Sequence, residues 1–190
     1  MKDTIEIRWH ARGGQGAKTA ATSLAEAAVA AGKFSQGFPE YGPERMGAPI
    51  LAFNRIGDRQ IRLNCAVAEP DIVVVFDSTL LDTENVTEGA NEDTIFLVNA
   101  KVSPEQMKGK LKLSNGSVYT VDATQIALDE IGRPIPNTPM IGALLRIVEL
   151  MPPDTFYAEI EHKFSGKFSQ KIVEGNIKAA KRAYEKVRGL

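Results

Sequence analysis

Residues 8–19 read RWHARGGQGAKT, and this stretch decides the fold. Its first residues complete a short apolar strand, predicted over residues 5–9, and its last residues open an alanine-rich helix, predicted over residues 17–31. Leu24 and the alanines of that helix recur at the spacing of a surface that packs on a sheet, and Gly32 is placed to end it. A strand that turns tightly into a helix is the opening unit of an α/β domain.

The rest of the chain continues this alternation. Residues 71–76 (DIVVVF) are a continuous apolar run, which is typical of a parallel strand buried on both faces. Residues 49–64 alternate around Gly57 and Asp58, which predicts a β-hairpin with antiparallel strands. Further patterns predict strands at 33–38, 94–98 and 117–123, and helices at 103–111, 123–131, 140–151, 154–164 and 170–187. We therefore expect one three-layer α/β domain over residues 1–190, with a mainly parallel sheet, a β-hairpin insertion and C-terminal helices.

Composition places the chain among ordinary globular proteins. It has 190 residues, of which 43% are hydrophobic and 25% are charged. The formal net charge of −1 gives no electrostatic reason to expect nucleic acid or an anionic membrane as a partner. No apolar run approaches the ~20 residues that a membrane span needs, and the first residues, MKDTIEIRW, lack the apolar core of a signal peptide. We expect a cytoplasmic protein.

Cysteine and histidine are too scarce for a metal centre built by this chain alone. Cys65 is the one cysteine in the sequence, so no intrachain disulfide can form. An iron–sulfur cluster or a structural zinc site needs about four ligands. His10 and His162 lie far apart in the sequence. Any redox chemistry must therefore use a group that this chain binds or that another chain supplies.

The glycine loop (residues 13–16) matches neither of two common phosphate-binding motifs. A Walker A motif needs two glycines, and the corresponding positions are Arg12 and Ala17. A dinucleotide-binding motif that starts at Gly14 needs a third glycine where Thr19 stands. The acidic residue that such a motif places about 20 positions later is also absent.

The glycine loop nevertheless has properties that suit an anion. Gly13, Gly14 and Gly16 allow a tight turn, and the start of the following helix offers unpaired N–H groups with a partial positive charge. Arg12 and Lys18 reinforce that sign. Two interpretations follow: the loop contacts an anionic ligand or partner group, or it is a compact turn whose glycines serve only helix–sheet packing.

A second loop (residues 38–49, FPEYGPERMGAP) follows the strand predicted at 33–38. Its prolines and glycines stiffen it, and it carries Glu40 and Glu44 with Arg45. Because it begins at the carboxyl end of a strand, we expect it beside the glycine loop, at the edge where open α/β sheets bind ligands. It is either a binding or interface loop, or a rigid surface loop with a solvated ion pair.

Another motif, IPNTP, precedes the helix predicted at 140–151. Its Asn137 and Thr138 are residue types that cap helix N-termini. We expect one of them to cap this helix.

Six sequence blocks carry a resemblance to a known family. In chain order they are IRWHARGGQGAKTA, FPEYGPERMGAP, PDIVVVFDSTLL, VTEG, VDAT and IPNTPMIGAL, and they lie within residues 7–144. Together they resemble the gamma subunits of the 2-oxoacid:ferredoxin oxidoreductases, of which pyruvate synthase is the best-known type. The ordered set is far more specific than either loop alone. The resemblance implies an α/β fold, which agrees with the pattern of strands and helices.

The resemblance also implies a reaction that a complex performs. Pyruvate, coenzyme A (CoA) and oxidised ferredoxin give acetyl-CoA, carbon dioxide and reduced ferredoxin, or the reverse. In the family, thiamine diphosphate and its Mg²⁺ lie between the alpha and beta subunits, and iron–sulfur clusters lie in the beta and delta subunits. This chain lacks the Gly-Asp-Gly…Asn motif that holds the metal, since Gly57 and Asp58 are followed by Arg59. We therefore expect no bound cofactor and no activity without the alpha, beta and delta subunits.

The residues that match the family define a candidate binding site. The resemblance implies that these residues help to complete the complex and to shape the CoA entrance. Ferredoxin binds to the complex as a whole. Position 46 is Met where relatives often have Arg. The resemblance does not identify which 2-oxoacid the complex uses, because gamma chains of the pyruvate, 2-oxoisovalerate and 2-oxoglutarate enzymes are similar. The candidate residues, none of them catalytic or metal-ligating, are Gly13, Gly14, Gln15, Gly16, Tyr41, Gly42, Glu44, Arg45 and Gly47.

Two other interpretations compete with a subunit of this kind. A self-contained α/β domain would use the glycine loop to bind a mononucleotide or CoA without partners. A purely structural subunit would touch no ligand. Tight nucleotide binding by the purified chain would favour the first, whereas co-purification with thiamine- and cluster-bearing subunits would favour the complex.

Overall fold

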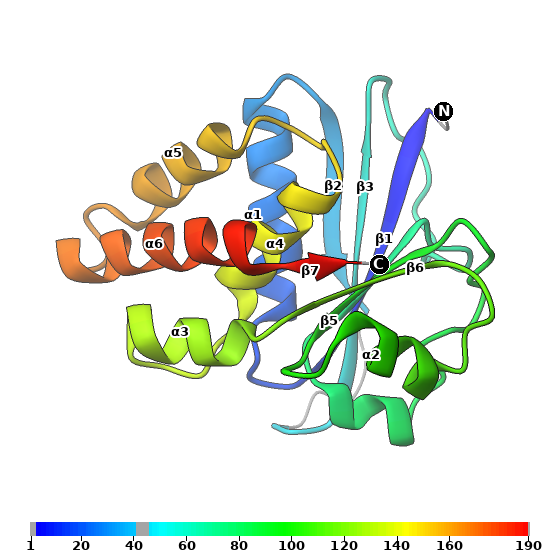
Figure 1. Ribbon diagram of the computed structural model, residues 1–190. Helices are drawn as coiled ribbons and strands as arrows, with labels where there is room; N and C mark the ends of the chain where they lie inside the picture. The colour runs from blue at the N-terminus through cyan, green and yellow to red at the C-terminus, as the bar shows by residue number, and fades with distance from the viewer. Residues whose placement is uncertain (1–2, 41–45, 190) are drawn as a thin grey trace.

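A single seven-stranded sheet organises the chain (Figure 1). The structure is a computed structural model that describes residues 3–40 and 46–189. Across the sheet the strand order is β2-β3-β1-β4-β5-β6-β7. The strands are β1 (Thr4–Arg12), β2 (Phe34–Pro39), β3 (Pro49–Gly57), β4 (Ile72–Val75), β5 (Ile95–Asn99), β6 (Ser117–Val121) and β7 (Arg188–Gly189).

The middle of the sheet is parallel and its two edges are antiparallel. Strand β4 runs parallel to both β1 and β5, and β5 runs parallel to β6. Strand β3 is antiparallel to β1 and β2, and β7 is antiparallel to β6. The predicted mainly parallel α/β sheet is confirmed in this central part. The apolar run of β4 supplies alternate side chains to both faces, as the sequence indicated.

The β-hairpin predicted around Gly57 and Asp58 is wrong. Strand β3 ends at Gly57, and residues 58–71 continue without a strand. The reason is that β3 already has a hydrogen-bonded neighbour on each side, β1 and β2, so neither of its edges is free for residues 61–64. The antiparallel pair is instead made by β2 and β3, on either side of the second loop.

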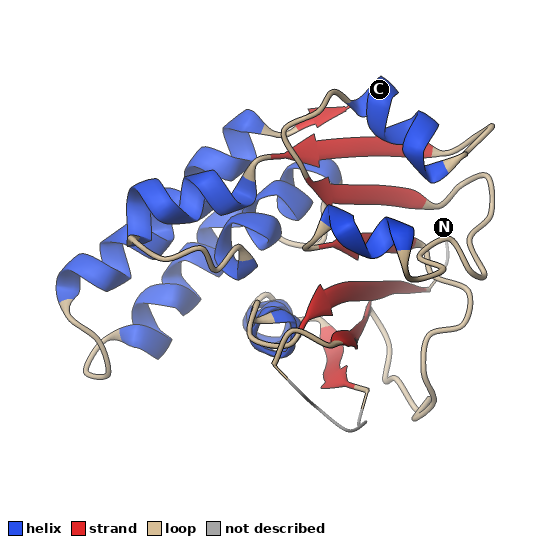
Figure 2. Ribbon diagram, turned by 90° about the horizontal axis from the view of Figure 1, so that it is seen from below, coloured by secondary structure: helices blue, strands red, loops and turns tan. Residues whose placement is uncertain are grey.

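The helices divide unequally between the two faces of the sheet (Figures 1 and 2). One face is covered by α1, α3, α4, α5 and α6, whose side chains share a single apolar core with Trp9, Val74 and Leu97 of the sheet. On the other face, α2 packs on β4, β5 and β6 through a smaller core. The helices are α1 (Ala17–Ala30), α2 (Pro104–Leu111), α3 (Ala123–Ile131), α4 (Asn137–Ile147), α5 (Pro153–Phe164) and α6 (Gln170–Lys186), with a 3₁₀ turn η1 (Ser78–Asp82).

Buried charge holds loops over the part of the second face that α2 does not cover. The guanidinium of Arg8, a residue only 5% exposed, donates to the carbonyl oxygens of Val86 and Glu88 and to Nε2 of His10. Arg55 is 1% exposed and donates to a carboxylate oxygen of Glu6. Arg8 lies on β1 and Arg55 on β3, where Arg55 also donates to the carbonyl oxygen of Ala66, so both side chains anchor loop segments to the sheet by hydrogen bonds.

Candidate functional site

The glycine loop and the second loop meet at the carboxyl edge of the sheet. The N–H of Gly13 donates to the carbonyl oxygen of Ala48 at 2.8 Å, and the N–H of Gly47 donates to the carbonyl oxygen of Gly13 at 3.1 Å. Strands β1 and β2 are both antiparallel to β3, so both end at this edge. The predicted adjacency of the two loops is therefore confirmed where the second loop is described.

Two glycines of the glycine loop adopt a left-handed backbone. Gly14 has φ +97° and Gly16 has φ +88°, a region that other residues rarely adopt. A Cβ on Gly14 would make only an ordinary van der Waals contact, with atoms of Met46 at 4.0 Å. A Cβ on Gly16 would lie 3.0 Å from Nδ2 and 3.2 Å from Cβ of Asn137. Gly16 therefore also permits the close approach of α4.

Gln15 and Arg12 tie the glycine loop to the end of β4. Gln15 Oε1 accepts from the N–H of Arg12 at 2.8 Å, and Gln15 Nε2 donates to Asp77 Oδ2 at 2.9 Å. Arg12 Nε lies 3.3 Å from the same Asp77 oxygen, and its Nη2 donates to Thr79 Oγ1 at 2.9 Å. Arg12 Nη1 also donates to the carbonyl oxygen of Gly47 at 3.2 Å. A single network thus joins both loops to β4.

This network changes the expected charge of the site. The sequence suggested that Arg12 and Lys18 together favour an anion, but Arg12 is paired with Asp77. Burial raises the pKa of Asp77, while hydrogen bonds from Thr79 and Gln15 and the charge of Arg12 lower it by more, so the pKa lies below its usual value. The carboxylate is therefore ionised at neutral pH and offsets Arg12. Lys18 lies in the first turn of α1.

The start of α1 remains suited to an anion. Gly16 is its N-cap, no side chain caps the helix, and its first turn contains no acidic residue. The first N–H groups of such a helix carry a partial positive charge. A shallow groove of about 470 Å³ lies over this end, between Gly14, Lys18, Met46 and Ile50.

Four of the predicted site residues, Tyr41, Gly42, Glu44 and Arg45, lie outside the described residues. The proposed pairing of Glu40 or Glu44 with Arg45 lies outside them too. The other five, Gly13, Gly14, Gln15, Gly16 and Gly47, are brought together by the contacts above.

Sequence reasoning missed the polar residues that follow β4 and β5. Asp77 and Thr79 come directly after the apolar run of β4, and Asn99 ends β5. Asn99 Nδ2 donates to Thr124 Oγ1 of α3 at 2.7 Å. Asp77, Asn99 and Thr124 border a second crevice of about 520 Å³ at the same sheet edge, which Gln15 also lines. A polar residue at the end of a buried parallel strand was the available signal.

The cap predicted for the helix after IPNTP is wrong. The helix, α4, begins at Asn137 itself and no side chain caps it. Asn137 Oδ1 accepts from the neighbouring N–H of Thr138, and Thr138 Oγ1 donates to Asn176 Oδ1 of α6 at 2.9 Å. Both residues are used for packing between elements: Asn137 against Gly16, and Thr138 against α6.

Comparison with known proteins decides the family. The sequence profile of the pyruvate ferredoxin/flavodoxin oxidoreductase family matches residues 6–186. The chain belongs to this family. Within the described residues, no helix is both long and apolar enough to cross a membrane, and no group of three or more His, Cys, Asp or Glu could hold a metal ion.

Relatives within the pyruvate ferredoxin/flavodoxin oxidoreductase family match this chain from end to end. The pyruvate synthase subunit PorC of Thermotoga maritima is 52% identical, over 98% of this chain and 96% of the relative. The common gamma subunit of the pyruvate/ketoisovalerate oxidoreductases of Pyrococcus abyssi is 47% identical, over 97% of both chains. A crystal structure of pyruvate oxidoreductase subunit PORC from Thermotoga maritima has 49% identity, 99% coverage of both chains and a TM-score of 0.88. The resemblance carried by the six sequence blocks is confirmed.

Proposed function

We propose that this chain is the gamma subunit of a multi-subunit pyruvate synthase. The whole complex converts pyruvate, CoA and oxidised ferredoxin to acetyl-CoA, carbon dioxide and reduced ferredoxin. The observation that carries this proposal is the similarity to PorC of Thermotoga maritima, which extends over almost all of both chains and is accompanied by the same fold. Pyruvate is the substrate named for that relative.

In this proposal the chain supplies no cofactor. The sequence offers one cysteine, whereas an iron–sulfur cluster takes about four cysteine ligands. The clusters therefore do not fit this chain and belong to the beta and delta subunits. Thiamine diphosphate with Mg²⁺ is assigned to the alpha and beta subunits. The gamma chain completes the assembly and is inactive alone, in the cytoplasm where ferredoxin and CoA are available.

The gamma chain does not choose the 2-oxoacid in this proposal. The relative from Pyrococcus abyssi is named as a subunit common to a pyruvate and a ketoisovalerate oxidoreductase. A chain that two enzymes share contacts features that both enzymes have in common. CoA and the neighbouring subunits are such features, whereas the side chain of the oxoacid is not.

The glycine loop and the second loop are the proposed contact of this chain with CoA or with a neighbouring subunit. The uncapped start of α1, Lys18 and the groove over Gly14 support an anionic group at this place. Such a group is either a phosphate of CoA or a carboxylate of a partner subunit. The proposed site consists of Gly13, Gly14, Gln15, Gly16, Tyr41, Gly42, Glu44, Arg45 and Gly47.

Affinity purification tests the assignment to a complex. The tagged chain, expressed in its native host under anaerobic conditions, is expected to bring with it subunits that carry thiamine diphosphate and iron, and CoA-dependent pyruvate oxidation. The chain purified alone is expected to be colourless and inactive. If the chain stays alone and binds CoA tightly in calorimetry, the alternative of a self-contained CoA-binding domain replaces this proposal.

Arg45→Ala in the reconstituted complex separates CoA from a partner subunit. The loss of one charge-assisted hydrogen bond is expected to cost ~1.5–3 kcal/mol, roughly a ten- to hundredfold effect. A raised KM for CoA that saturating CoA overcomes assigns the residue to CoA, whereas dissociation of the complex on dilution assigns it to the interface. Arg59→Ala, at an exposed ion pair with Asp3, is the control and should behave as wild type. Wild-type behaviour of Arg45→Ala in both assays would refute the site.

A further inference from the structure

An apolar groove lies on the helical side of the molecule, away from the sheet. It runs between the segment that links α3 to α4 and the turn that links α5 to α6, and its volume is about 380 Å³. Its apolar lining consists of Ile131, Ile135, Phe164, Phe168 and Ile172. Phe168 is 51% exposed and packs edge-on against Phe164 at a ring-centroid distance of 5.3 Å. Half of a large aromatic side chain is therefore left in water beside other apolar groups.

The charged side chains that line this groove are all basic. Its charged lining residues are Arg133, Lys163 and Lys167, and no acidic residue is found among the described residues that line it. Lys163 is paired with Glu26 of α1. Arg133 and Lys167 form no ion pair with any residue that the structure describes. Two cations at the rim are thus available to a carboxylate from outside.

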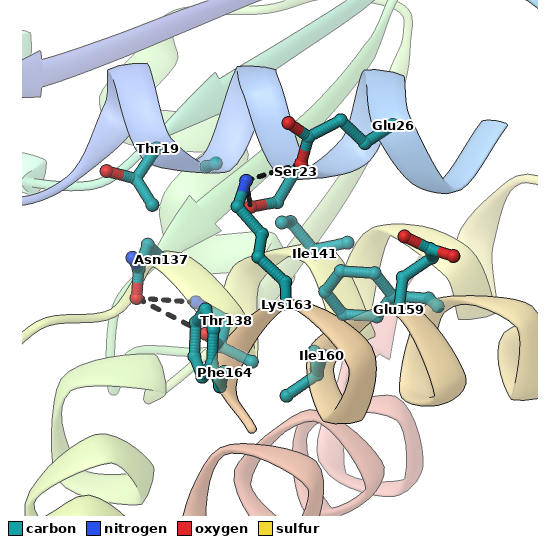
Figure 3. Close-up of a pocket in the computed structure, with 12 residues that line it drawn as sticks. Thr19, Ser23, Glu26, Asn137, Thr138, Ile141, Glu159, Ile160, Lys163 and Phe164 are labelled. Atoms are coloured by element: carbon teal, nitrogen blue, oxygen red, sulfur yellow. Dashed lines mark hydrogen bonds and ion pairs between the residues drawn. The ribbon is translucent and has the colours of Figure 1, made fainter. Parts of the chain in front are cut away.

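A small cavity beneath α1 adjoins the groove (Figure 3). Thr19, Asn137, Lys163 and Phe164 line both the groove and a small cavity behind it. Figure 3 shows Lys163 reaching from α5 to α1, where its Nζ lies 3.4 Å from Ser23 Oγ. Asn137 also contacts Gly16. A group that enters the groove therefore lies beside Asn137, which in turn contacts the glycine loop.

We propose that this groove is the docking site for an acidic segment of another subunit of the same complex, an inference that rests on the proposed function. An apolar side chain of that segment packs against Phe164 and Phe168, and its carboxylates pair with Arg133 and Lys167. The apolar lining and the one-signed rim together select this chemistry, since charge complementarity sets specificity while apolar burial supplies affinity.

A second copy of this chain fits the groove less well. A twofold contact through the same surface would bring the rim cations of one copy toward those of the other. Like charges placed together at an interface oppose association. The unpaired cations at Arg133 and Lys167 therefore favour a partner of opposite charge over self-association.

Charge reversal tests the rim. Arg133→Glu/Lys167→Glu is compared with Lys110→Glu/Lys178→Glu, which makes the same change in net charge at exposed residues that do not line the groove. Each chain is mixed with the co-expressed alpha, beta and delta subunits, and the dissociation constant is measured at low and high salt. The groove variant is expected to bind about tenfold more weakly or worse at low salt, with a smaller difference at high salt. The control is expected to bind as wild type.

Truncation of the exposed aromatic residue tests the apolar lining. Phe168→Ser should weaken assembly about tenfold at every salt concentration, because a buried aromatic anchor is lost. Leu128→Ser, which truncates a side chain of α3 that is 42% exposed and does not line the groove, is the control. Thermal unfolding of each isolated chain verifies that the variants fold.

Three results would overturn the inference. If both groove variants assemble with the wild-type dissociation constant, the groove is not an interface, while the proposed function stands. If the wild-type chain forms a dimer that Phe168→Ser makes monomeric, the occupant is a second copy. If the wild-type chain binds none of the other subunits, the proposed function itself fails, and the docking site fails with it.

Discussion

The paired substitutions Gly14→Ala and Gly16→Ala separate two reasons for a glycine in the glycine loop. Both residues have positive φ, so each alanine variant is expected to lose about 1–2 kcal/mol of folding stability, because alanine disfavours the left-handed backbone. Only at Gly16 does the new Cβ also come too close to another side chain, that of Asn137, at 3.0 to 3.3 Å. One of these contacts is to Cβ of Asn137, which the backbone fixes, so a rotamer change cannot relieve it. Overpacking of this kind adds ~1–3 kcal/mol.

Thermal unfolding measures the difference. One kcal/mol corresponds to about 2–4 °C for a domain of this size. Gly14→Ala should therefore lower Tm by roughly 2–8 °C, and Gly16→Ala by several degrees more. A double-mutant cycle with Asn137→Gly is the decisive control, since it removes the contacted side chain. The double variant Gly16→Ala/Asn137→Gly should be more stable, by ~1 kcal/mol or more, than the sum of the two single effects predicts. The effects of Gly14→Ala and Asn137→Gly should simply add.

Equal Tm values for Gly14→Ala and Gly16→Ala, or additivity in both cycles, would refute the argument. The close approach of α4 to the glycine loop would then contribute nothing to the requirement for glycine. The backbone conformation alone would explain both residues.

Two further predictions concern the buried polar face of β1. Burial, reinforced by the charge of Arg8, lowers the pKa of His10 to about 3. As the pH falls below about 6.5, His10 is therefore protonated in the unfolded chain but not in the folded chain. The free energy of unfolding then decreases by ~1.4 kcal/mol for each pH unit below that point. His10→Gln, which keeps an acceptor for Arg8, should retain about 2–3 kcal/mol of the stability that the wild type loses between pH 6.5 and 4.5 in urea titrations, and identical pH profiles would contradict this. Arg8→Met should cost ~2–4 kcal/mol of stability and expose amides near residues 86–88 to hydrogen exchange, because buried carbonyls lose their donor. The control Arg59→Met, at an ion pair whose side chains are 81% and 69% exposed, should change stability by less than ~0.5 kcal/mol. Equal losses of stability in the two variants would show that Arg8 does not hold the loops.

Much of the candidate site could be predicted because its rule is local. Gly13, Gly14 and Gly16 stand between an apolar strand and an amphipathic helix, and that order alone sends the loop to the carboxyl edge of a parallel sheet. The second loop follows from the same rule applied to β2. The partners of these loops could not be predicted, because Asp77 and Thr79 are more than 60 residues away from Arg12 and Gln15. No periodicity in a sequence specifies which polar side chains meet across such a separation.

The sequence by itself determined most of the strands and helices, the α/β class and the membership of the family. These properties depend on hydrophobic period, on turn residues and on ordered motifs, each of which is contained in a short stretch of chain. The helix limits at Ala123–Ile131 and the apolar strand before Asp77 are examples.

Only the tertiary structure decided how the strands pair and where charge is buried. Residues 49–64 carry the pattern of a hairpin, yet β3 pairs with β1 and β2, because a strand has only two edges and the nearer partners in space occupy both. Likewise nothing in the sequence marks Arg8 as buried, yet it is only 5% exposed and donates to the carbonyl oxygens of Ala68 and Glu88. Strand pairing and the burial of charge are set by which distant segments meet, and that depends on the packing of the whole chain.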